Sequence, residues 1–367
     1  MKASYFGPMG YSERSKFPDT WPIPASYHDP KTSVQSYQDG MEECEFAEEI
    51  GFEWVSFSEH HYSGRIATGN PALMAAAVAE RCKKVKIAIL GQLLPLNNPV
   101  RAAEELGMLD NLTDGRVVIG FLRGTPNEDQ TYGVNPSEGR GRLMEGMELV
   151  IKALTESQPF SWEGRYYQYR TVSVWPPPVQ QPMPPVIVAT RSDDAVKFAA
   201  DHGLGLGISF IPVEQMAKIT AKYYGWCQDA GWEPEPDKRV YRGSIYLAET
   251  DQKADEWFEN LRGPQSRRRL GMTTAVEQAV QAARSGEQYE LRNLISGSAQ
   301  GDVVGSAPRL SFMGGPDTVA KQMKEFHDQC GTGVVDLFFQ QPTVDHSDVM
   351  RQIELFGKEV LPQIKEF

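Results

Sequence analysis

The sequence predicts a (β/α)8 TIM barrel with an insertion before the last strand. Short runs rich in β-branched and aromatic residues alternate with longer amphipathic stretches, and this alternation is typical of βα units around a parallel sheet. Eight such runs are present, which is the number that closes a barrel of this kind. The predicted strands span residues 3–6, 54–58, 85–90, 117–122, 186–189, 204–209, 240–247 and 334–339.

Amphipathic stretches between these runs predict the helices. Several of them end at Asp-Gly or Gly-Phe pairs, and glycine commonly ends a helix because it adopts the left-handed backbone conformation without a steric penalty. The predicted helices span residues 34–50, 71–81, 100–112, 140–154, 193–201, 213–230, 251–262, 316–329 and 347–364.

A doubly wound sheet is the alternative architecture, and the first loop argues against it. Such a sheet normally carries a glycine-rich dinucleotide fingerprint after its first strand, whereas Gly7-Pro8-Met9-Gly10 leads here into a proline-rich loop. The 367 residues would suffice for two domains, but α/β barrels often exceed about 250 residues as one unit. We therefore expect a single barrel domain over residues 1–367.

Two segments interrupt the regular alternation. Residues 158–185 are rich in aromatic residues and proline, which predicts an ordered excursion with a small hairpin. Residues 263–315 combine a run of three arginines with Gly/Ser punctuation. A long insertion at this place in a barrel predicts a lid or an oligomer contact.

The composition excludes several classes of function. The formal net charge is −12, so we expect no general affinity for nucleic acid or for an anionic membrane, and any anionic ligand must be met by local cations. The four cysteines are far apart and lack the spacing of zinc or redox sites. The N-terminus does not resemble a signal peptide, and no apolar run approaches the roughly 20 residues that span a bilayer. We expect a cytoplasmic protein.

The second predicted strand carries the first candidate site residues. Alternate side chains of a strand point to opposite faces, so Val55 and Phe57 are expected to meet the helices. Ser58 and His60 then point inward near the carboxyl rim, where barrel active sites lie. A His-His pair by itself is equally compatible with a solvated loop. We expect no metal site, because neighbouring strand residues diverge and no other histidine has ligand spacing.

Two further strand ends are candidates for holding a ligand. After the third strand, Gly91 lacks a side chain and would let a flat ligand approach the backbone, although a tight turn alone would also explain it. After the fourth strand, Arg123 leaves an apolar run, where an unpaired charge is costly to bury. We therefore expect Arg123 to meet an anion or, alternatively, an acidic side chain.

The fifth strand leads into a candidate phosphate site. Thr190-Arg191-Ser192 places two hydroxyl groups and a cation at a predicted helix N-terminus, where free backbone N–H groups and the helix dipole favour anions. Ser192 would serve equally well as a plain helix cap without a ligand.

Taken in order, these motifs resemble those of the bacterial luciferase-like flavin-dependent monooxygenases. The similarity extends over nearly the whole chain and is strongest over residues 50–155. It is carried by Glu59-His60-His61, Asn70-Pro71, Asn98-Pro99, Arg101, Glu104-Glu105, Leu109-Asp110, Asp114-Gly115-Arg116, Arg123-Gly124, Tyr132-Gly133, Ala189-Thr190-Arg191-Ser192, Gly314-Gly315-Pro316 and the closing Gly357-Lys358-Glu359-Val360-Leu361-Pro362.

The resemblance implies a barrel that uses reduced FMN, supplied by a separate flavin reductase, together with molecular oxygen. It implies that His60 is the catalytic histidine, and that the turn after the third strand packs against the flavin ring, often through a non-prolyl cis peptide. The cofactor-binding residues that we expect are Ser58, Leu90, Gly91, Gln92, Arg123, Thr190, Arg191 and Ser192, the last four forming the phosphate grip.

We therefore predict a two-component FMN-dependent monooxygenase acting on a small organic substrate, by hydroxylation, Baeyer–Villiger oxidation or oxidative cleavage. A deazaflavin-dependent reductase or dehydrogenase on the same barrel and a flavin-binding protein without catalysis are the alternatives. The family resemblance further implies a homodimer.

Overall fold

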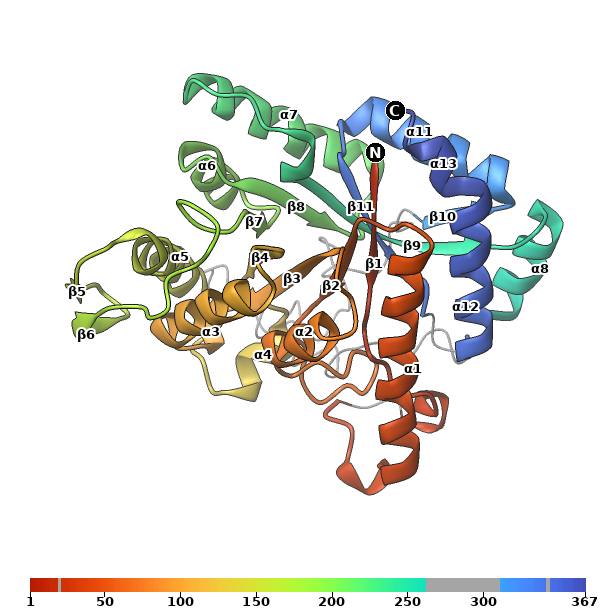
Figure 1. Cartoon of the computed structure of the whole chain (residues 1–367), viewed down its shortest axis with the longest axis horizontal. Helices are drawn as coiled ribbons and strands as arrows, with labels where there is room; N and C mark the ends of the chain where they lie inside the picture. The colour runs from red at the N-terminus through yellow and green to blue at the C-terminus, as the bar shows by residue number, and fades with distance from the viewer. Residues whose placement is uncertain (19–20, 262–310, 341–343) are drawn as a thin grey trace, which may run out of the picture.

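The computed structural model describes residues 1–18, 21–261, 311–340 and 344–367. Eight parallel strands form a closed barrel, in the order β1, β2, β3, β4, β7, β8, β9 and β11, and β11 pairs again with β1 (Figure 1). All eight predicted strands are confirmed. They are β1 (Lys2–Phe6), β2 (Trp54–Phe57), β3 (Lys86–Leu93), β4 (Val117–Leu122), β7 (Val186–Ala189), β8 (Gly205–Ser209), β9 (Arg239–Leu247) and β11 (Val334–Phe338).

Helices surround the barrel and follow the strands along the chain (Figure 1). Eight of the nine predicted helices are regular α-helices whose ends agree with the prediction within a few residues. They are α1 (Pro30–Glu49), α2 (Pro71–Ala79), α3 (Pro99–Leu112), α5 (Gly139–Thr155), α6 (Asp193–Asp201), α7 (Val213–Asp229), α8 (Asp251–Leu261) and α11 (Pro316–Cys330). Short 3-10 turns are η1 (Arg14–Lys16), η2 (Ala25–Tyr27), η3 (Leu94–Leu96) and η4 (Pro236–Lys238).

The last predicted helix, over residues 347–364, is divided into three pieces. α12 (His346–Leu355) passes through a π-helical turn, η6 (Phe356–Val360), into α13 (Leu361–Ile364). Pro362 lies just after this turn and has no N–H group to continue the regular hydrogen-bond ladder. The chain nevertheless stays helical over residues 346–364, so the predicted helix is confirmed, with one π-helical turn inside it.

Asparagine side chains begin two of the helices that follow the site strands. Asn70 accepts a hydrogen bond from the Leu73 N–H at the start of α2, and Asn98 accepts from the N–H groups of Val100 and Arg101 at the start of α3. A proline follows each asparagine at the first helical position, where its missing N–H has no cost. The two Asn-Pro pairs thus fix where the chain turns from rim to helix.

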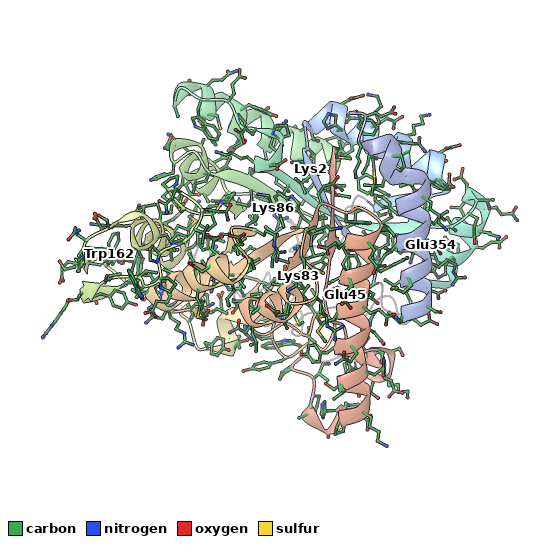
Figure 2. All side chains as sticks on the ribbon, viewed as in Figure 1. Lys2, Glu45, Lys83, Lys86, Trp162 and Glu354 are labelled. Carbon is green, nitrogen blue, oxygen red and sulfur yellow. The ribbon has the colours of Figure 1, made fainter. Side chains whose placement is uncertain are left out.

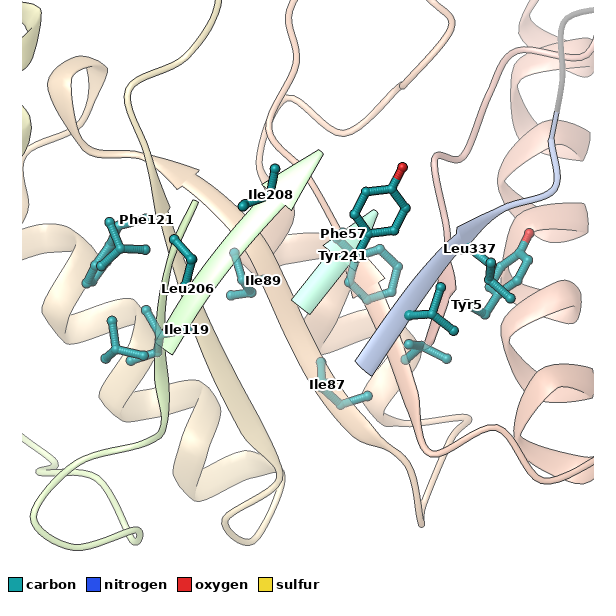
Figure 3. Close-up of a cluster of buried hydrophobic side chains, with 14 of the residues drawn as sticks. Tyr5, Phe57, Ile87, Ile89, Ile119, Phe121, Leu206, Ile208, Tyr241 and Leu337 are labelled. Carbon is teal, nitrogen blue, oxygen red and sulfur yellow. The ribbon is translucent and has the colours of Figure 1, made fainter. Parts of the chain in front are cut away.

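The core has two layers, one outside and one inside the barrel wall. Outward-facing side chains such as Phe57, Ile89 and Phe121 pack against the helices (Figure 3). Trp54 and Leu90 belong to a smaller apolar cluster formed by the inward-facing side chains. The predicted alternation of β2 is confirmed, because Val55 and Phe57 belong to the outer layer and Trp54 to the inner one. Charged side chains such as Lys83 and Glu354 project at the outer surface (Figure 2).

Two elements, α4 and β10, were not predicted, and the predicted hairpin consists of β5 and β6. The short helix α4 (Pro126–Thr131) follows β4, and β10 (Ser311–Gly314) pairs with the second half of β9. In the excursion at 158–185, β5 (Phe160–Glu163) and β6 (Gln168–Val172) form an antiparallel hairpin, where the sequence predicts a small hairpin without its bounds. Of the predicted insertion at 263–315, residues 263–310 lie outside the described part of the chain.

No helix within the described ranges is both long and apolar enough to cross a lipid bilayer. All four cysteines lie in the described ranges, are buried and form no disulfide.

Candidate active site

The predicted site residues lie at the carboxyl ends of four consecutive strands, β2, β3, β4 and β7. The strand register pairs Phe57 with Ile89, Gln92 with Phe121, and Phe121 with Val188. Ser58, Arg123 and Thr190 each follow one of these strand ends directly. The barrel therefore brings segments more than 100 residues apart in the chain to one part of its rim.

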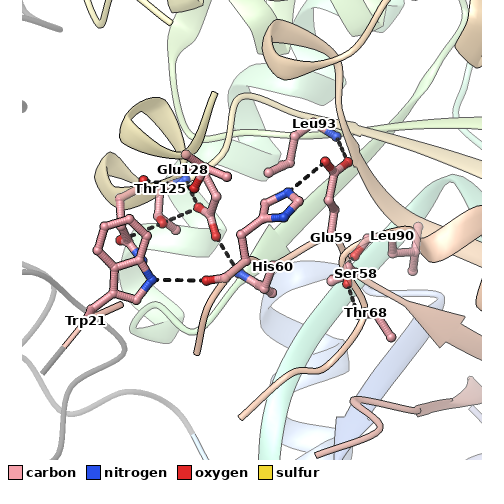
Figure 4. Close-up of polar contacts among 12 residues, drawn as sticks. Trp21, Ser58, Glu59, His60, Thr68, Leu90, Leu93, Thr125 and Glu128 are labelled. Atoms are coloured by element: carbon pink, nitrogen blue, oxygen red, sulfur yellow. Dashed lines mark hydrogen bonds and ion pairs between the residues drawn. The ribbon is translucent and has the colours of Figure 1, made fainter. Parts of the chain in front are cut away.

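His60 and Glu128 form a hydrogen-bonded pair at this rim. His60 Nδ1 lies 2.9 Å from Glu128 Oε1 (Figure 4). The His60 side chain is 23% exposed, whereas that of Glu128 is only 1% exposed. Burial alone would raise the pKa of Glu128, but hydrogen bonds from His60 and Thr125 and the charge of His60 lower it to about 2. Glu128 is therefore an acceptor at neutral pH, and Nδ1 of His60 carries the hydrogen.

The local sequence around Glu128 explains its placement. Thr125 caps α4, and its own N–H donates to Glu128 Oε2 at 2.7 Å, which completes a capping box. One carboxylate oxygen thus fixes the helix start while the other holds His60. Sequence reasoning missed Glu128, although Thr-x-x-Glu with proline at the first helical position is a readable helix signal.

Glu59 and His61 form a second pair that supports the β3 turn. Both side chains are buried, and His61 Nε2 lies 3.1 Å from Glu59 Oε1. Glu59 Oε2 accepts from the Leu93 N–H at 2.9 Å (Figure 4). The Glu59 N–H donates to the Gly91 carbonyl at 3.1 Å. The adjacent histidines therefore bind different carboxylates, and His61 supports the turn through Glu59.

The β3 turn itself is held tightly by protein contacts. The Leu90–Gly91 peptide bond is cis, and the Leu90 carbonyl accepts hydrogen bonds from Ser58 Oγ and from Arg242 Nη2, the latter at 2.8 Å. A Cβ atom on Gly91 would overlap the Gly120 carbonyl and the Leu122 side chain, so only glycine fits. Ser58 is 2% exposed, and its hydroxyl is engaged by Leu90 and Arg242.

Gln92 carries a buried acceptor at the end of this turn. The residue is 3% exposed, and its Oε1 atom accepts no hydrogen bond from the part of the chain that the structure describes. A buried acceptor without a donor costs about 1–3 kcal/mol. Such an atom in a native protein calls for a ligand or water that donates to it.

Of the four candidate phosphate residues, the structure brings Thr190 and Ser192 into contact with each other. Ser192 is the N-cap residue of α6, but its hydroxyl makes no capping bond and lies 3.2 Å from Thr190 Oγ1. Arg191 is exposed, and Arg123 Nη2 donates to the Pro136 carbonyl at 3.1 Å. Two hydroxyl groups therefore face each other at a helix N-terminus without capping it.

Comparison with known proteins identifies the family. A model of the luciferase-like monooxygenase family matches residues 20–333. The chain belongs to this family. The resemblance inferred from the sequence is thereby confirmed, and the chain is an oxidoreductase of the monooxygenase class.

Two relatives show how the similarity is distributed. The uncharacterized protein y4wF of Sinorhizobium fredii is 31% identical over 48% of this chain, and the chain spans only 51% of that protein's length. The oxygenase component of a flavin-dependent trigonelline monooxygenase from Acinetobacter baylyi is 27% identical over 64% of this chain and 69% of its own length.

Solved structures of other proteins confirm the fold of this luciferase-like chain. The monooxygenase RslO1 from Streptomyces bottropensis is 25% identical, covers 99% of both chains and has a TM-score of 0.76. The oxygenating constituent of 3,6-diketocamphane monooxygenase from Pseudomonas putida, in complex with FMN, is 19% identical, covers 99% of both chains and has a TM-score of 0.73. An F420-dependent secondary alcohol dehydrogenase is 17% identical, covers 99% of this chain and 98% of its own, and has a TM-score of 0.69.

Two more polar residues in the barrel of this luciferase-like protein were missed by sequence reasoning. Arg242 lies in β9 and Asp336 in β11, opposite each other in the strand register. The sequence did contain a signal for this pair: each of two apolar predicted strands carries a single charged residue. A buried charge requires a partner, so two such residues of opposite sign are candidates for an ion pair.

Proposed function

We propose that the chain is the oxygenase component of a two-component monooxygenase, which uses reduced FMN from a separate flavin reductase and molecular oxygen to oxygenate a small organic substrate. The observation that carries this proposal is the His60–Glu128 pair beside the β3 turn. Membership of the luciferase-like monooxygenase family supports the reaction class. The trigonelline relative, itself an oxygenase component, supports the dependence on a reductase. A cytoplasmic location stays a prediction.

The residues at the rim fit a flavin. The buried Gln92 Oε1 atom needs a donor, and the ring of a flavin carries N–H groups. Leu90 and Leu93 are 6% and 2% exposed and supply an apolar wall. Thr190 and Ser192, at the N-terminus of α6, supply hydroxyl donors for a phosphate, with Arg123 and Arg191 as the nearby cations that an acidic protein needs there.

The chain's own contribution to the reaction centres on His60. When bound, reduced FMN supplies the electrons that activate oxygen. Glu128 fixes the His60 ring and keeps hydrogen on Nδ1, so Nε2 is the atom that takes up or releases a proton at the rim. The apolar wall of the β3 turn keeps water away from the reacting groups.

Rapid mixing tests this proposal. Protein saturated with photoreduced FMN is mixed with aerated buffer, and flavin absorbance is followed. We expect bound FMN to reoxidise more slowly than free FMN, because the apolar wall and the fixed His60 proton control its reaction. Reoxidation at the rate of free FMN in buffer contradicts the proposal.

A deazaflavin-dependent reductase is the second candidate, because the F420-dependent alcohol dehydrogenase shares this fold. Parallel binding titrations with FMN and F420 discriminate the two. Tighter binding of F420 would replace the monooxygenase proposal with a hydride-transfer reaction.

We also propose a homodimer that uses α2 and α3, which pack beside each other. Leu73 on α2 and Met108 and Leu112 on α3 are 72%, 53% and 60% exposed, and large exposed apolar side chains on neighbouring helices are candidates for an interface. In sedimentation experiments we expect Leu73→Glu to give a monomer. Val34→Glu on α1, where Val34 is also exposed, is the control that leaves the mass unchanged.

A further inference from the structure

An ion pair inside the barrel has no part in the proton chemistry proposed above. Arg242 Nε lies 2.6 Å from Asp336 Oδ2, and the two side chains are only 9% and 0% exposed. Asp336 Oδ1 accepts hydrogen bonds from Ser4 Oγ and Ser56 Oγ, both at 2.7 Å. The carboxylate is therefore held by three side chains from β1, β2 and β9.

The remaining donors of Arg242 converge on the β3 turn. Nη2 donates to the Leu90 carbonyl at 2.8 Å and to Ser56 Oγ at 3.3 Å. Nη1 donates to Ser58 Oγ, and this hydroxyl in turn donates to the same Leu90 carbonyl. The ring of Phe6 covers the guanidinium, with Cζ 3.9 Å from the ring centroid. The Leu90 carbonyl thus accepts two hydrogen bonds. One comes from Arg242, and the other comes from Ser58, whose hydroxyl is itself held by Arg242.

Stability alone explains this arrangement poorly. A buried ion pair generally contributes no more to stability than well-packed apolar side chains of similar volume, because both charges lose their hydration. Trp54, Ala88 and Val118 are among the inward-facing side chains that form an apolar cluster in the same barrel. The guanidinium has, however, a rigid planar set of donors that can hold several acceptors at fixed angles.

We propose that Arg242 is a positioning residue for the flavin, with Asp336 holding it in place. By fixing the Leu90 carbonyl it sets the orientation of the turn from Leu90 to Gln92, on which the flavin ring rests in the proposed function. Ser58 belongs to the same support and acts through Leu90. This inference rests on the proposed function for its ligand, whereas the contacts to the turn are independent of it.

Arg116 provides a matched control, because it binds the chain beside the amino end of β3, whereas Arg242 binds it at the carboxyl end. Its Nη1 donates at 2.9 Å to the carbonyl of Val85, the residue just before β3, and its Nε donates at 3.0 Å to the Thr113 carbonyl at the end of α3. Arg242→Met and Arg116→Met therefore each remove an arginine that binds a backbone carbonyl beside β3. Only the Leu90 carbonyl, which Arg242 binds, belongs to the rim.

The experiment measures FMN affinity by quenching of flavin fluorescence, together with the absorption spectrum of bound FMN. We expect Arg242→Met to weaken FMN binding by about tenfold, since a hydrogen bond to a charged donor is lost. The spectrum should also change, whereas Arg116→Met should alter neither. Arg242→Lys keeps the charge and should restore part of the affinity. It is also the variant to use if Arg242→Met does not fold.

A second measurement needs no flavin. Amide hydrogen exchange of the apo chain over residues 88–94 should be faster in Arg242→Lys and Arg242→Met than in wild type, and unchanged in Arg116→Met. If wild type binds no FMN, the proposed function fails, while the exchange result still decides whether Arg242 fixes the turn. Unchanged exchange in both Arg242 variants, or FMN affinity and spectrum equal to wild type, would overturn the inference.

Discussion

His60 and Glu128 lie 68 residues apart in the chain, yet their side chains meet at 2.9 Å at the carboxyl rim of the barrel. His60 follows the end of β2, and Glu128 lies in the first turn of α4. Because Glu128 occupies Nδ1, the histidine has one defined atom, Nε2, for proton exchange with a ligand.

Removal of the imidazole tests its role directly. We expect His60→Ala to slow the single-turnover oxidation of bound reduced FMN by about 10²-fold, which is the lower range for a proton-transferring side chain. FMN affinity should change little, since the turn and the phosphate residues remain. His327→Ala, which removes a histidine bonded to the Thr332 carbonyl away from the rim, is the control. A rate equal to that of wild type would make His60 structural and would favour a flavin-binding protein without catalysis.

Glu128→Gln tests how much the charge of this carboxylate contributes to stability, through the pH dependence of the unfolding free energy. The folded pKa of Glu128 is lowered to about 2 from its ordinary value of 4.5, so its charge stabilises the fold above about pH 4.5, and this contribution is lost as pH falls towards 2. We expect the variant to lose on the order of 3 kcal/mol of unfolding free energy at pH 7 and progressively less below pH 4.5. Urea unfolding at pH 7, 4.5 and 3 measures this. An equal loss at all three values would show that the charge is unimportant.

Much of this site was predictable because it follows strand ends. The β-branched runs located β2, β3, β4 and β7, and the alternation along β2 separated His60 from His61. Glu128 was missed because α4 has only six residues and no apolar face to reveal it. The contact of Arg242 with Asp336 depends on the register between β9 and β11, which residue patterns within each strand do not encode.

The hydroxyl pair at α6 should discriminate FMN from riboflavin. Thr190 and Ser192 are the groups proposed to hold the phosphate, which riboflavin lacks. We expect the double variant Thr190→Val, Ser192→Ala to bind FMN roughly tenfold more weakly, in line with the loss of charge-assisted hydrogen bonds. Riboflavin affinity should be unchanged. Parallel fluorescence titrations measure both, and an equal loss for the two ligands would assign the hydroxyls to the fold instead.

Gln92 offers a test in which stability and binding change in opposite directions. Its buried Oε1 atom has no donor within the described residues, so replacing the carboxamide by an apolar side chain of similar length removes an unpaired acceptor. We expect Gln92→Met to raise the unfolding free energy of the apo chain by about 1 kcal/mol and to weaken FMN binding about fivefold, because the ligand loses an acceptor.

Gln180→Met is the matched control for this prediction. Gln180 Nε2 donates to Asp110 Oδ1 at 2.7 Å and to the Val117 carbonyl at 2.9 Å, so the protein itself binds both N–H groups of this carboxamide. The control should therefore destabilise the chain and leave FMN affinity unchanged. Thermal unfolding and fluorescence titration of both variants measure the two quantities. If Gln92→Met instead destabilises the apo chain as Gln180→Met does, Gln92 serves the fold, and the flavin ring needs another acceptor at this rim.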